Sequence, residues 1–215
     1  MKFNLSILKS EFAKNVITLI TGTAIAQAIP IAISPILTRI YSPEDFGVFA
    51  LYLSISSIIA IVATGRYELA INLPAKDEDA IQVLWLSCIL TILVSAFTLI
   101  IVLFFNENIS NLLQNDRIGD WLYFIPVTIF FSGIYQSFNY WHNRKKKYAV
   151  LSKSRVIQTI NTSAVNLGVG VVKKGGVGGL VFGNLIGQFL SSLYMVYVFF
   201  KKDINKIEIK KEQIK

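Results

Sequence analysis

The chain has 215 residues, of which 53% are hydrophobic and only 16% are charged. Soluble domains carry roughly 25% charged residues, so the composition argues against a water-soluble fold, and its apolar surplus excludes intrinsic disorder. The net charge of +8 is therefore interpreted as the loop charge of a membrane protein and not as a nucleic-acid-binding surface.

Six segments contain no Asp, Glu, Lys or Arg: 15–38, 46–65, 80–106, 121–141, 156–172 and 175–200. A helix needs roughly 17–25 apolar residues to cross a bilayer, and every segment reaches that length. The segments are too continuous for barrel strands. The predicted fold class is all-α, a polytopic membrane protein whose residues 15–200 form a bundle of six transmembrane helices.

Residues 1–14 precede the first apolar segment and are predicted to form an amphipathic cytoplasmic lead-in lying at the membrane surface. Their apolar side chains lie near one helical face: Phe3, Ile7, Leu8 and Phe12. A frayed terminus is the alternative. The first apolar segment is expected to stay in the mature protein, because its small Ala24, Ala26 and Ala28 lie inside it and not after it.

Three prolines lie within the predicted helices, Pro30 and Pro35 in the first and Pro126 in the fourth. Each is expected to kink its helix, because proline removes a backbone hydrogen bond. Between the first two helices, Ser42-Pro43-Glu44 predicts an N-cap followed by proline at the first helical position. These two helices are therefore expected to form an antiparallel hairpin.

The positive-inside rule assigns the orientation. With a cytoplasmic N-terminus, 17 Lys and Arg residues lie on the cytoplasmic side, including Arg144–Lys147 and six lysines in the basic cytoplasmic tail 201–215. Four lie on the other side: Arg39, Arg117, Lys173 and Lys174. Both termini are thus predicted to be cytoplasmic, in a multi-pass protein.

The sixth apolar segment carries four glycines at intervals of four residues, Gly175, Gly179, Gly183 and Gly187. Small residues at this spacing let two helix backbones approach closely in a membrane, which predicts a helix-packing face. A phosphate-binding glycine loop is disfavoured because the required Gly-Lys-Ser/Thr ending is absent.

Uncharged polar residues within the spans are the first candidates for substrate binding, because polar groups in hydrocarbon must pair, line a wet cavity or serve a function. They suit sugar hydroxyls as well as interhelical hydrogen bonds, and packing remains the alternative for each one. The candidates are Gln27, Gln136, Asn139, Gln158, Asn161, Asn184 and Gln188.

Three charged residues near the ends of the first two helices complete the candidate set. Arg66 and Glu68 lie at the predicted inner end of the second helix, and Arg39 lies at the outer end of the first. An arginine there either anchors the helix at the membrane surface or binds an anionic headgroup. Both alternatives stay open.

No catalytic group stands out, so the chain is predicted not to be an enzyme and to need no cofactor. Asp77-Glu78-Asp79 resembles the acid-x-acid motif of glycosyltransferases, but its short loop favours a solvated helix start. Cys88 has no neighbouring base. One histidine, His142, and one cysteine do not predict a metal site.

The segment from Leu37 to Pro74, LTRIYSPEDFGVFALYLSISSIIAIVATGRYELAINLP, resembles the first hairpin of the Wzx-type O-antigen and capsule flippases. These belong to the multidrug/oligosaccharidyl-lipid/polysaccharide exporter superfamily. Residues 140–188, including YWHNRKKKYAVLSKSRVIQ and GGLVFGNLIGQ, resemble a later part of the same family. The resemblance implies translocation of an undecaprenyl-diphosphate-linked oligosaccharide across the bacterial inner membrane during surface polysaccharide biosynthesis.

The resemblance also implies an incomplete transporter, because family members usually have twelve or more spans in two lobes. Six spans correspond to the N-terminal lobe, so a separate C-terminal half or a homodimer is expected to complete it, with membrane lipid as a further partner. Alternatives are export of another small amphiphile and a non-transporting scaffold in polysaccharide assembly. The resemblance further implies a charged central cavity, which would map here only onto Arg39, Arg66 and Glu68.

Overall fold

The computed structural model describes residues 5–173 and 175–204, and within them the side chains of residues 13–173 and 175–203. This part of the chain contains helices and no strand. In chain order the elements are α1 (Leu5–Ile40), α2 (Pro43–Ala63), α3 (Tyr67–Ala70), α4 (Asp77–Leu112), the 3-10 turn η1 (Asp116–Ile118), α5 (Gly119–Leu122), α6 (Ile125–Arg144), α7 (Tyr148–Lys173), α8 (Val177–Phe199) and the π-helical turn η2 (Phe200–Ile204).

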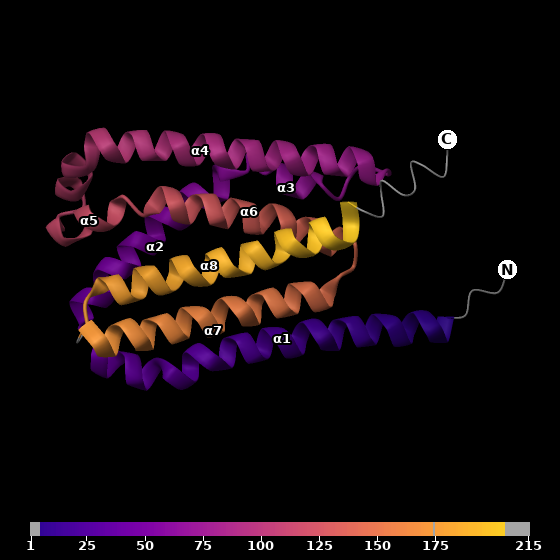
Figure 1. The fold of residues 1–215 in the computed structure, drawn as a ribbon, viewed down its shortest axis with the longest axis horizontal. Helices are drawn as coiled ribbons and strands as arrows, with labels where there is room; N and C mark the ends of the chain where they lie inside the picture. The colour runs from indigo at the N-terminus through magenta and orange to yellow at the C-terminus, as the bar shows by residue number, and fades with distance from the viewer. Residues whose placement is uncertain (1–4, 174, 205–215) are drawn as a thin grey trace.

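Five long helices lie side by side in the order α4, α6, α8, α7 and α1, and α2 packs behind α6 (Figure 1). We call the end with α5 and the α1–α2 and α7–α8 turns the α5 end, and the opposite end the α6–α7 end. α1 begins and α8 finishes at the α6–α7 end, so the described chain starts and finishes at the same end. A short turn connects α1 to α2, but α2 packs against α6 and α8 and α1 packs against α7, so the expected hairpin of two packed helices is not formed.

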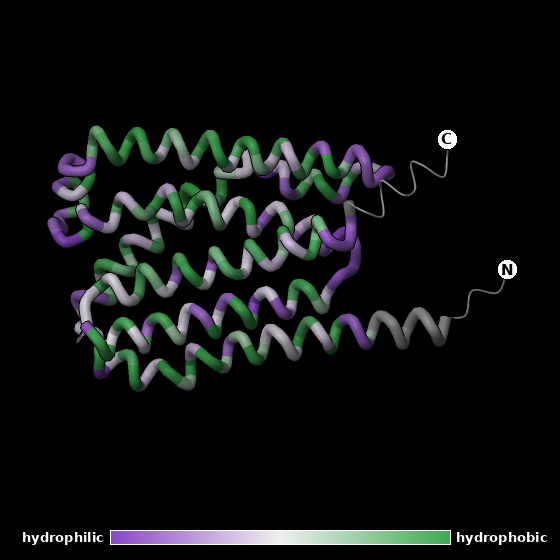
Figure 2. The backbone as a smooth tube through the Cα atoms, in the orientation of Figure 1, coloured by the Kyte–Doolittle hydropathy of each residue, from purple (hydrophilic) through white to green (hydrophobic). Residues whose placement is uncertain are grey.

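Four helical stretches in the described residues are long and apolar enough to cross a membrane: 13–40, 43–63, 77–112 and 177–203. The bent pair Asp116–Leu122 and Ile125–Arg144, with an angle of 51°, makes a fifth if it is one broken span. The all-helical class is therefore observed, but six apolar spans are not. α7 is long enough to cross a membrane but not apolar enough, because Lys153, Arg155 and several amides lie within it. Figure 2 shows these residues as polar segments that alternate with apolar ones along the helix.

Local signals explain where several helices begin and where the predicted bounds were wrong. Ser42 caps α2 in a capping box with Asp45, and Pro43 takes the first turn, as predicted. Pro126 does not kink a helix interior, because α6 begins at Ile125 and the proline occupies its first turn. α1 continues through the predicted lead-in from Leu5, but the side chains that would make it amphipathic lie outside the described residues.

Large buried side chains fill the bundle near both ends. Tyr52 of α2 lies in the apolar cluster toward the α5 end, together with side chains of α6 and α8. Trp141 of α6 and Phe199 of α8 pack edge to face at 5.3 Å in the cluster toward the α6–α7 end. α1 contributes little to either cluster, because α7 separates it from the rest of the bundle.

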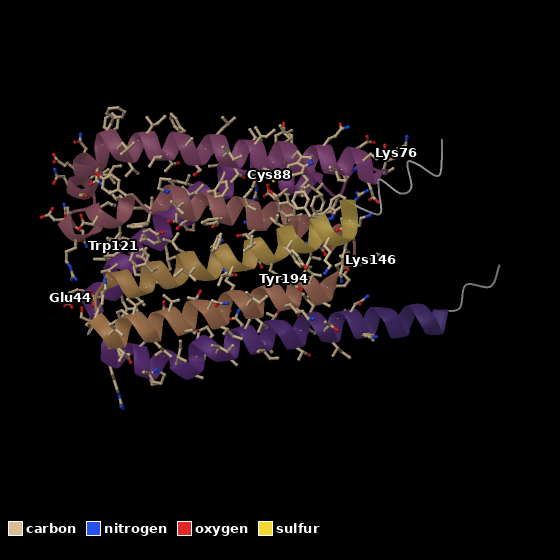
Figure 3. All side chains as sticks on the ribbon, viewed as in Figure 1. Glu44, Lys76, Cys88, Trp121, Lys146 and Tyr194 are labelled. Atoms are coloured by element: carbon tan, nitrogen blue, oxygen red, sulfur yellow. The ribbon has the colours of Figure 1, made fainter. Side chains whose placement is uncertain are left out.

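Ion pairs connect α4 and η2 to α6 and the α6–α7 turn at the α6–α7 end. Asp77, Glu78 and Asp79 occupy the first turn of α4, and Glu78 and Asp79 are exposed, as expected for a solvated helix start. Asp77 in addition accepts hydrogen bonds from Arg144 and Lys145, which makes it part of an ionic cluster. Asp203 accepts hydrogen bonds from Lys147 and from the Trp141 indole. In Figure 3, Lys76 and Lys146 mark this end, while Glu44 and Trp121 mark the α5 end.

Candidate functional site

Polar side chains follow one another along α7 at spacings of three and four residues, which places them on one side of the helix. We call Ser152, Arg155, Gln158, Thr162 and Asn166 the polar seam. All five are buried or half-buried, because α1 covers α7 on one side and α8 covers it on the other. A helix that looks too polar to cross a membrane alone thus satisfies its polar groups inside the bundle.

On the α1 side, the polar seam makes two hydrogen bonds. The Ser152 hydroxyl donates to the Thr18 carbonyl at 2.6 Å, and the Arg155 guanidinium donates to the Thr23 hydroxyl at 2.7 Å. The helices come this close because Gly22 lacks a side chain, and a Cβ built there would overlap Ser152. The two contacts hold α1 on the bundle by polar groups as well as by packing.

On the α8 side, three glycines face the seam and its neighbours. A Cβ at Gly187 would overlap the Thr162 hydroxyl, one at Gly183 would overlap the Asn166 amide, and one at Gly179 would overlap the Tyr41 phenol. The glycine face therefore lies against α7 and Tyr41. Gly175 differs, because it precedes α8 with φ of 97° in the α7–α8 turn, where a Cβ would lie 2.7 Å from the Ile40 carbonyl.

Tyr41 and Asn166 close the seam at the α5 end. The Tyr41 phenol donates to the Asn166 backbone carbonyl at 2.6 Å, and the Asn166 side-chain nitrogen, oriented by its neighbours, donates to the Gly179 and Thr162 carbonyls at 3.0 Å. Burial raises the pKa of Tyr41, and the nearby carboxylate of Asp45 adds to this shift. The phenol therefore remains protonated, as a donor, throughout the physiological pH range.

Among the predicted amides, the structure brings Gln158 and Gln188 together. Gln158 Nε2 donates to Gln188 Oε1 at 3.2 Å, and Gln188 Nε2 donates to the Ser132 hydroxyl of α6 at 2.7 Å, so three helices are linked. Asn161 instead donates to the Ile157 carbonyl of its own helix. The Oδ1 atom of Asn184 is buried and has no hydrogen-bond partner among the described residues.

The other predicted residues lie apart from this network. Gln27 of α1 and Gln136 of α6 are exposed, and Asn139 is half-buried. Arg39 is exposed near the C-terminal end of α1. These residues do not converge on one pocket within this chain.

Arg66 and Glu68 do not form an ion pair in the described structure. Arg66 is exposed, and its backbone is left-handed with φ of 62°. Glu68 is buried, with only 3% of its surface exposed, and accepts a hydrogen bond from Thr64. The preceding Gly65 lies beside Leu90 of α4, and the end of α3 reaches the ionic cluster, where Arg144 donates to the Ile71 carbonyl at 3.1 Å. Glu68 therefore closes the α2–α3 turn.

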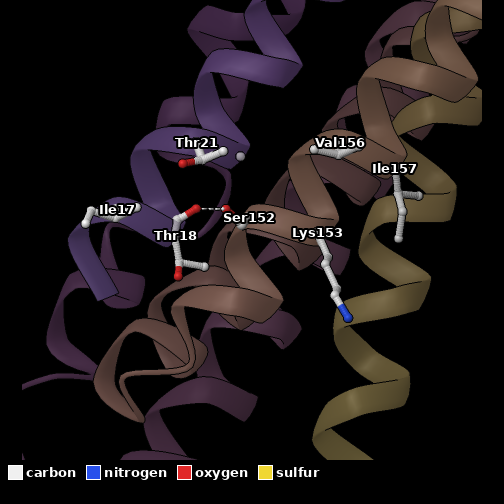
Figure 4. Close-up of a pocket in the computed structure, with 8 residues that line it drawn as sticks. Ile17, Thr18, Thr21, Ser152, Lys153, Val156 and Ile157 are labelled. Carbon is white, nitrogen blue, oxygen red and sulfur yellow. Dashed lines mark hydrogen bonds between the residues drawn. The ribbon is translucent and has the colours of Figure 1, made fainter. Parts of the chain in front are cut away.

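A cleft of about 550 Å³ opens between α1 and α7, toward the α6–α7 end (Figure 4). The surface that its lining residues expose to the cleft is mostly apolar; these residues are Ile17, Thr18, Thr21, Gly22, Ser152, Lys153, Val156 and Ile157. Lys153 is exposed, and Arg155 lies next to the cleft on the same helix. Such a cleft suits an amphiphile with an anionic group, because apolar walls and a cation lie side by side.

Sequence reasoning did not single out Lys153, Arg155, Thr23 or Ser132. Lys153 and Arg155 entered the prediction only as cytoplasmic charges, because the fifth uncharged segment starts at residue 156, whereas α7 begins at Tyr148. The spacing of Ser152, Arg155 and Gln158 is the signal that favours a helical start. The partners on α1 and α6 are far away in the sequence and leave no local signal.

A family model described as "Polysaccharide biosynthesis protein" matches residues 36–215. The chain belongs to this polysaccharide biosynthesis family. The matched region contains α2 to α8, including the whole of the polar seam, which agrees with the resemblance seen in the sequence. The comparisons with curated proteins and with solved structures give no match.

Proposed function

We propose that this member of the polysaccharide biosynthesis family is one lobe of a flippase for a lipid-linked oligosaccharide. Its substrate is a glycan on undecaprenyl diphosphate, which it helps to move between the leaflets of the bacterial cytoplasmic membrane for a surface polysaccharide such as O-antigen or lipopolysaccharide. The basic α6–α7 end then faces the cytoplasm, as the positive-inside rule predicts.

The α1–α7 cleft carries this proposal. A lipid-linked oligosaccharide is an amphiphile with a diphosphate between its lipid and its sugars, and the cleft places apolar Ile17, Val156 and Ile157 beside Lys153. Lysine binds phosphate as a mobile point charge with three donors. The cleft therefore offers an entry site for the diphosphate at the cytoplasmic side.

A second lobe completes the pathway in this proposal. α1 is covered by α7 but leaves Gln27 and Thr21 exposed within a stretch that is long and apolar enough to span a membrane. An amide exposed to hydrocarbon is costly, which favours a protein surface or a wet cavity against this face. We infer that a homodimer or a separately encoded lobe supplies it.

The proposed step is translocation without covalent chemistry, metal or cofactor. Asp77, from the acidic motif, is held by Arg144 and Lys145, and Cys88 lies buried beside apolar side chains. Neither arrangement provides an activated nucleophile. Translocation needs only that the two lobes open alternately on either side of a shared site.

The test replaces Lys153 by Gln in a transport-competent assembly containing this lobe. We expect surface polysaccharide to fall about tenfold, the effect of losing a charge-assisted hydrogen bond of ~1.4 kcal/mol. Lys146→Gln, an exposed lysine at the same end but outside the cleft, is the matched control and should export normally. Normal export by Lys153→Gln would refute the role of the cleft, and glycan export without this lobe would favour a scaffold.

A further inference from the structure

A second pocket, of about 360 Å³, lies at the α5 end, opposite the α1–α7 cleft. η1 and α5 form one wall, with Arg117, Asp120 and Trp121, and the α7–α8 turn forms the other, with Lys173, Gly176 and Gly178. This pocket differs from the cleft in having polar and apolar walls in similar measure and charged groups of both signs.

Asp45 holds the two walls together from behind. Its carboxylate accepts hydrogen bonds from the Arg117 guanidinium at 2.8 Å and from the Gly176 amide at 3.2 Å, and its side chain is only 7% exposed. Gly175 and Gly176 have φ of 97° and 93°, a backbone conformation that favours glycine. The pocket is therefore formed in advance and does not need a ligand to assemble it.

Trp121 supplies a fixed aromatic wall. Its ring packs on Phe124 and Phe182, each at a centroid distance of 5.9 Å, and it remains half-buried. Gly178 keeps the ring edge clear, because a Cβ there would lie 2.9 Å from the indole. An aromatic ring backed in this way presents a rigid flat surface at little entropic cost.

Among the described residues, cationic and anionic side chains occur in equal number around the pocket. Arg117 and Lys173 are cationic, whereas Asp120 on the rim and Asp45 behind are anionic. The Arg117 side chain is 55% exposed, so it has donors left beyond the one that Asp45 takes, and Asp120 is an exposed acceptor. A bare anion would be repelled by Asp120, while hydroxyl groups can both donate to the carboxylate and accept from the two cations.

We propose that this pocket binds an uncharged sugar ring of the translocated glycan. A pyranose has an apolar C–H face to lie on Trp121 and hydroxyl groups at its edge for Arg117, Asp120 and Lys173. The inference rests on the proposed function, because translocation is what brings a glycan to this end of the bundle. The pocket then receives sugars after or during translocation, and the α1–α7 cleft receives the phosphates.

The test measures sugar binding by the purified full chain in detergent, using D-glucose, D-galactose and N-acetyl-D-glucosamine in isothermal titration and saturation-transfer NMR. We expect at least one sugar to bind saturably with a Kd on the order of 1 mM, its C–H face receiving the most saturation. Inorganic phosphate should not compete, which distinguishes this pocket from a diphosphate site. Binding is read without transport, so failure of export and failure of sugar binding are separate results.

Matched variants locate the site. Asp120→Asn and Lys173→Gln should each weaken binding about tenfold, because each removes a charged hydrogen-bonding partner without touching Asp45. Asp116→Asn, in η1 but outside the pocket lining, and Lys146→Gln should leave the Kd unchanged. Absence of saturable binding by all three sugars, competition by phosphate, or a Kd in both pocket variants equal to that of the unsubstituted chain would overturn the proposal.

Discussion

Gly183 lies at one of the places where α8 closely approaches the polar seam of α7. A Cβ there would overlap the Asn166 amide and lie 2.9 Å from the Thr162 carbonyl, which belongs to backbone and cannot rotate away. The regular glycine spacing predicts such a close packing face. It does not predict the partner helix, because the partner is set by which polar and small residues meet across the bundle.

Replacing Gly183 by Leu should wedge α8 away from α7. Overpacking costs roughly 1–3 kcal/mol, so we expect a lower melting temperature and lower folded yield in detergent. Gly168→Leu is the matched control, because nothing lies within 4 Å of a Cβ built at that α7 glycine. Equal melting temperatures for both variants would contradict the close α7–α8 contact.

Asp45 is a buried carboxylate whose partners come from three elements. It accepts from its own helix cap at Ser42, from Arg117 of η1 and from Gly176 before α8. Asp45→Asn removes the charge and places an amide NH2 group next to hydrogen-bond donors that need an acceptor. We therefore expect the free energy of unfolding to fall by about 1–3 kcal/mol. Thermal unfolding measures it, with the exposed neighbour Glu44→Gln as control. A loss no larger than that of Glu44→Gln would show that Asp45 is not needed to hold the elements together.

At the scale of elements, local chemistry predicted some features well. Ser42-Pro43 marked the start of α2, since a capping side chain and a fixed φ act within one turn. The length of α7 was underestimated, because Lys153 and Arg155 suggest a loop when read alone. In the structure α7 begins at Tyr148, and Arg155 and its neighbour Ser152 donate to Thr23 and Thr18 of α1. The Gln158–Gln188 hydrogen bond could not be predicted from local sequence either, because it depends on how α7 and α8 pack against each other.

The arrangement of elements makes a prediction about topology. Asn111, near the C-terminal end of α4, is exposed toward the α5 end, and Lys146, in the α6–α7 turn, is exposed at the other. With the buried Cys88 replaced by Ala, cysteines at these two positions should label from opposite faces of the membrane. We expect a membrane-impermeant maleimide to label position 111 in intact cells and position 146 only after lysis. Labelling of position 146 in intact cells would invert the orientation.

At the scale of the whole molecule, the bundle has two unlike flanks. α4, at one flank, exposes large apolar side chains such as Phe97 at 63% and Phe104 at 79%, which suits contact with lipid. α1, at the other flank, also exposes large apolar side chains such as Ile31 at 72%, but it exposes Gln27 and Thr21 among them and borders the cleft. The asymmetry favours α1 as the flank that meets a second lobe, and the sequence alone could not show it because helix order in the bundle is not helix order in the chain.

A cysteine at Gln27, with Cys88 replaced by Ala, should therefore crosslink to a second copy or to a matching lobe, while a cysteine at Phe104 should not.

In a strain lacking its own flippase, we expect the chain alone to leave surface polysaccharide absent if the partner is a separate lobe, and co-expression with that lobe to restore it. A homodimer would instead give restoration by the chain alone together with Gln27 crosslinks between identical copies. Restoration by the chain alone without any crosslink at position 27 would contradict the two-lobe proposal, because the exposed amide on α1 would then face lipid in a working transporter, at a cost that an isolated polar group in hydrocarbon does not recover.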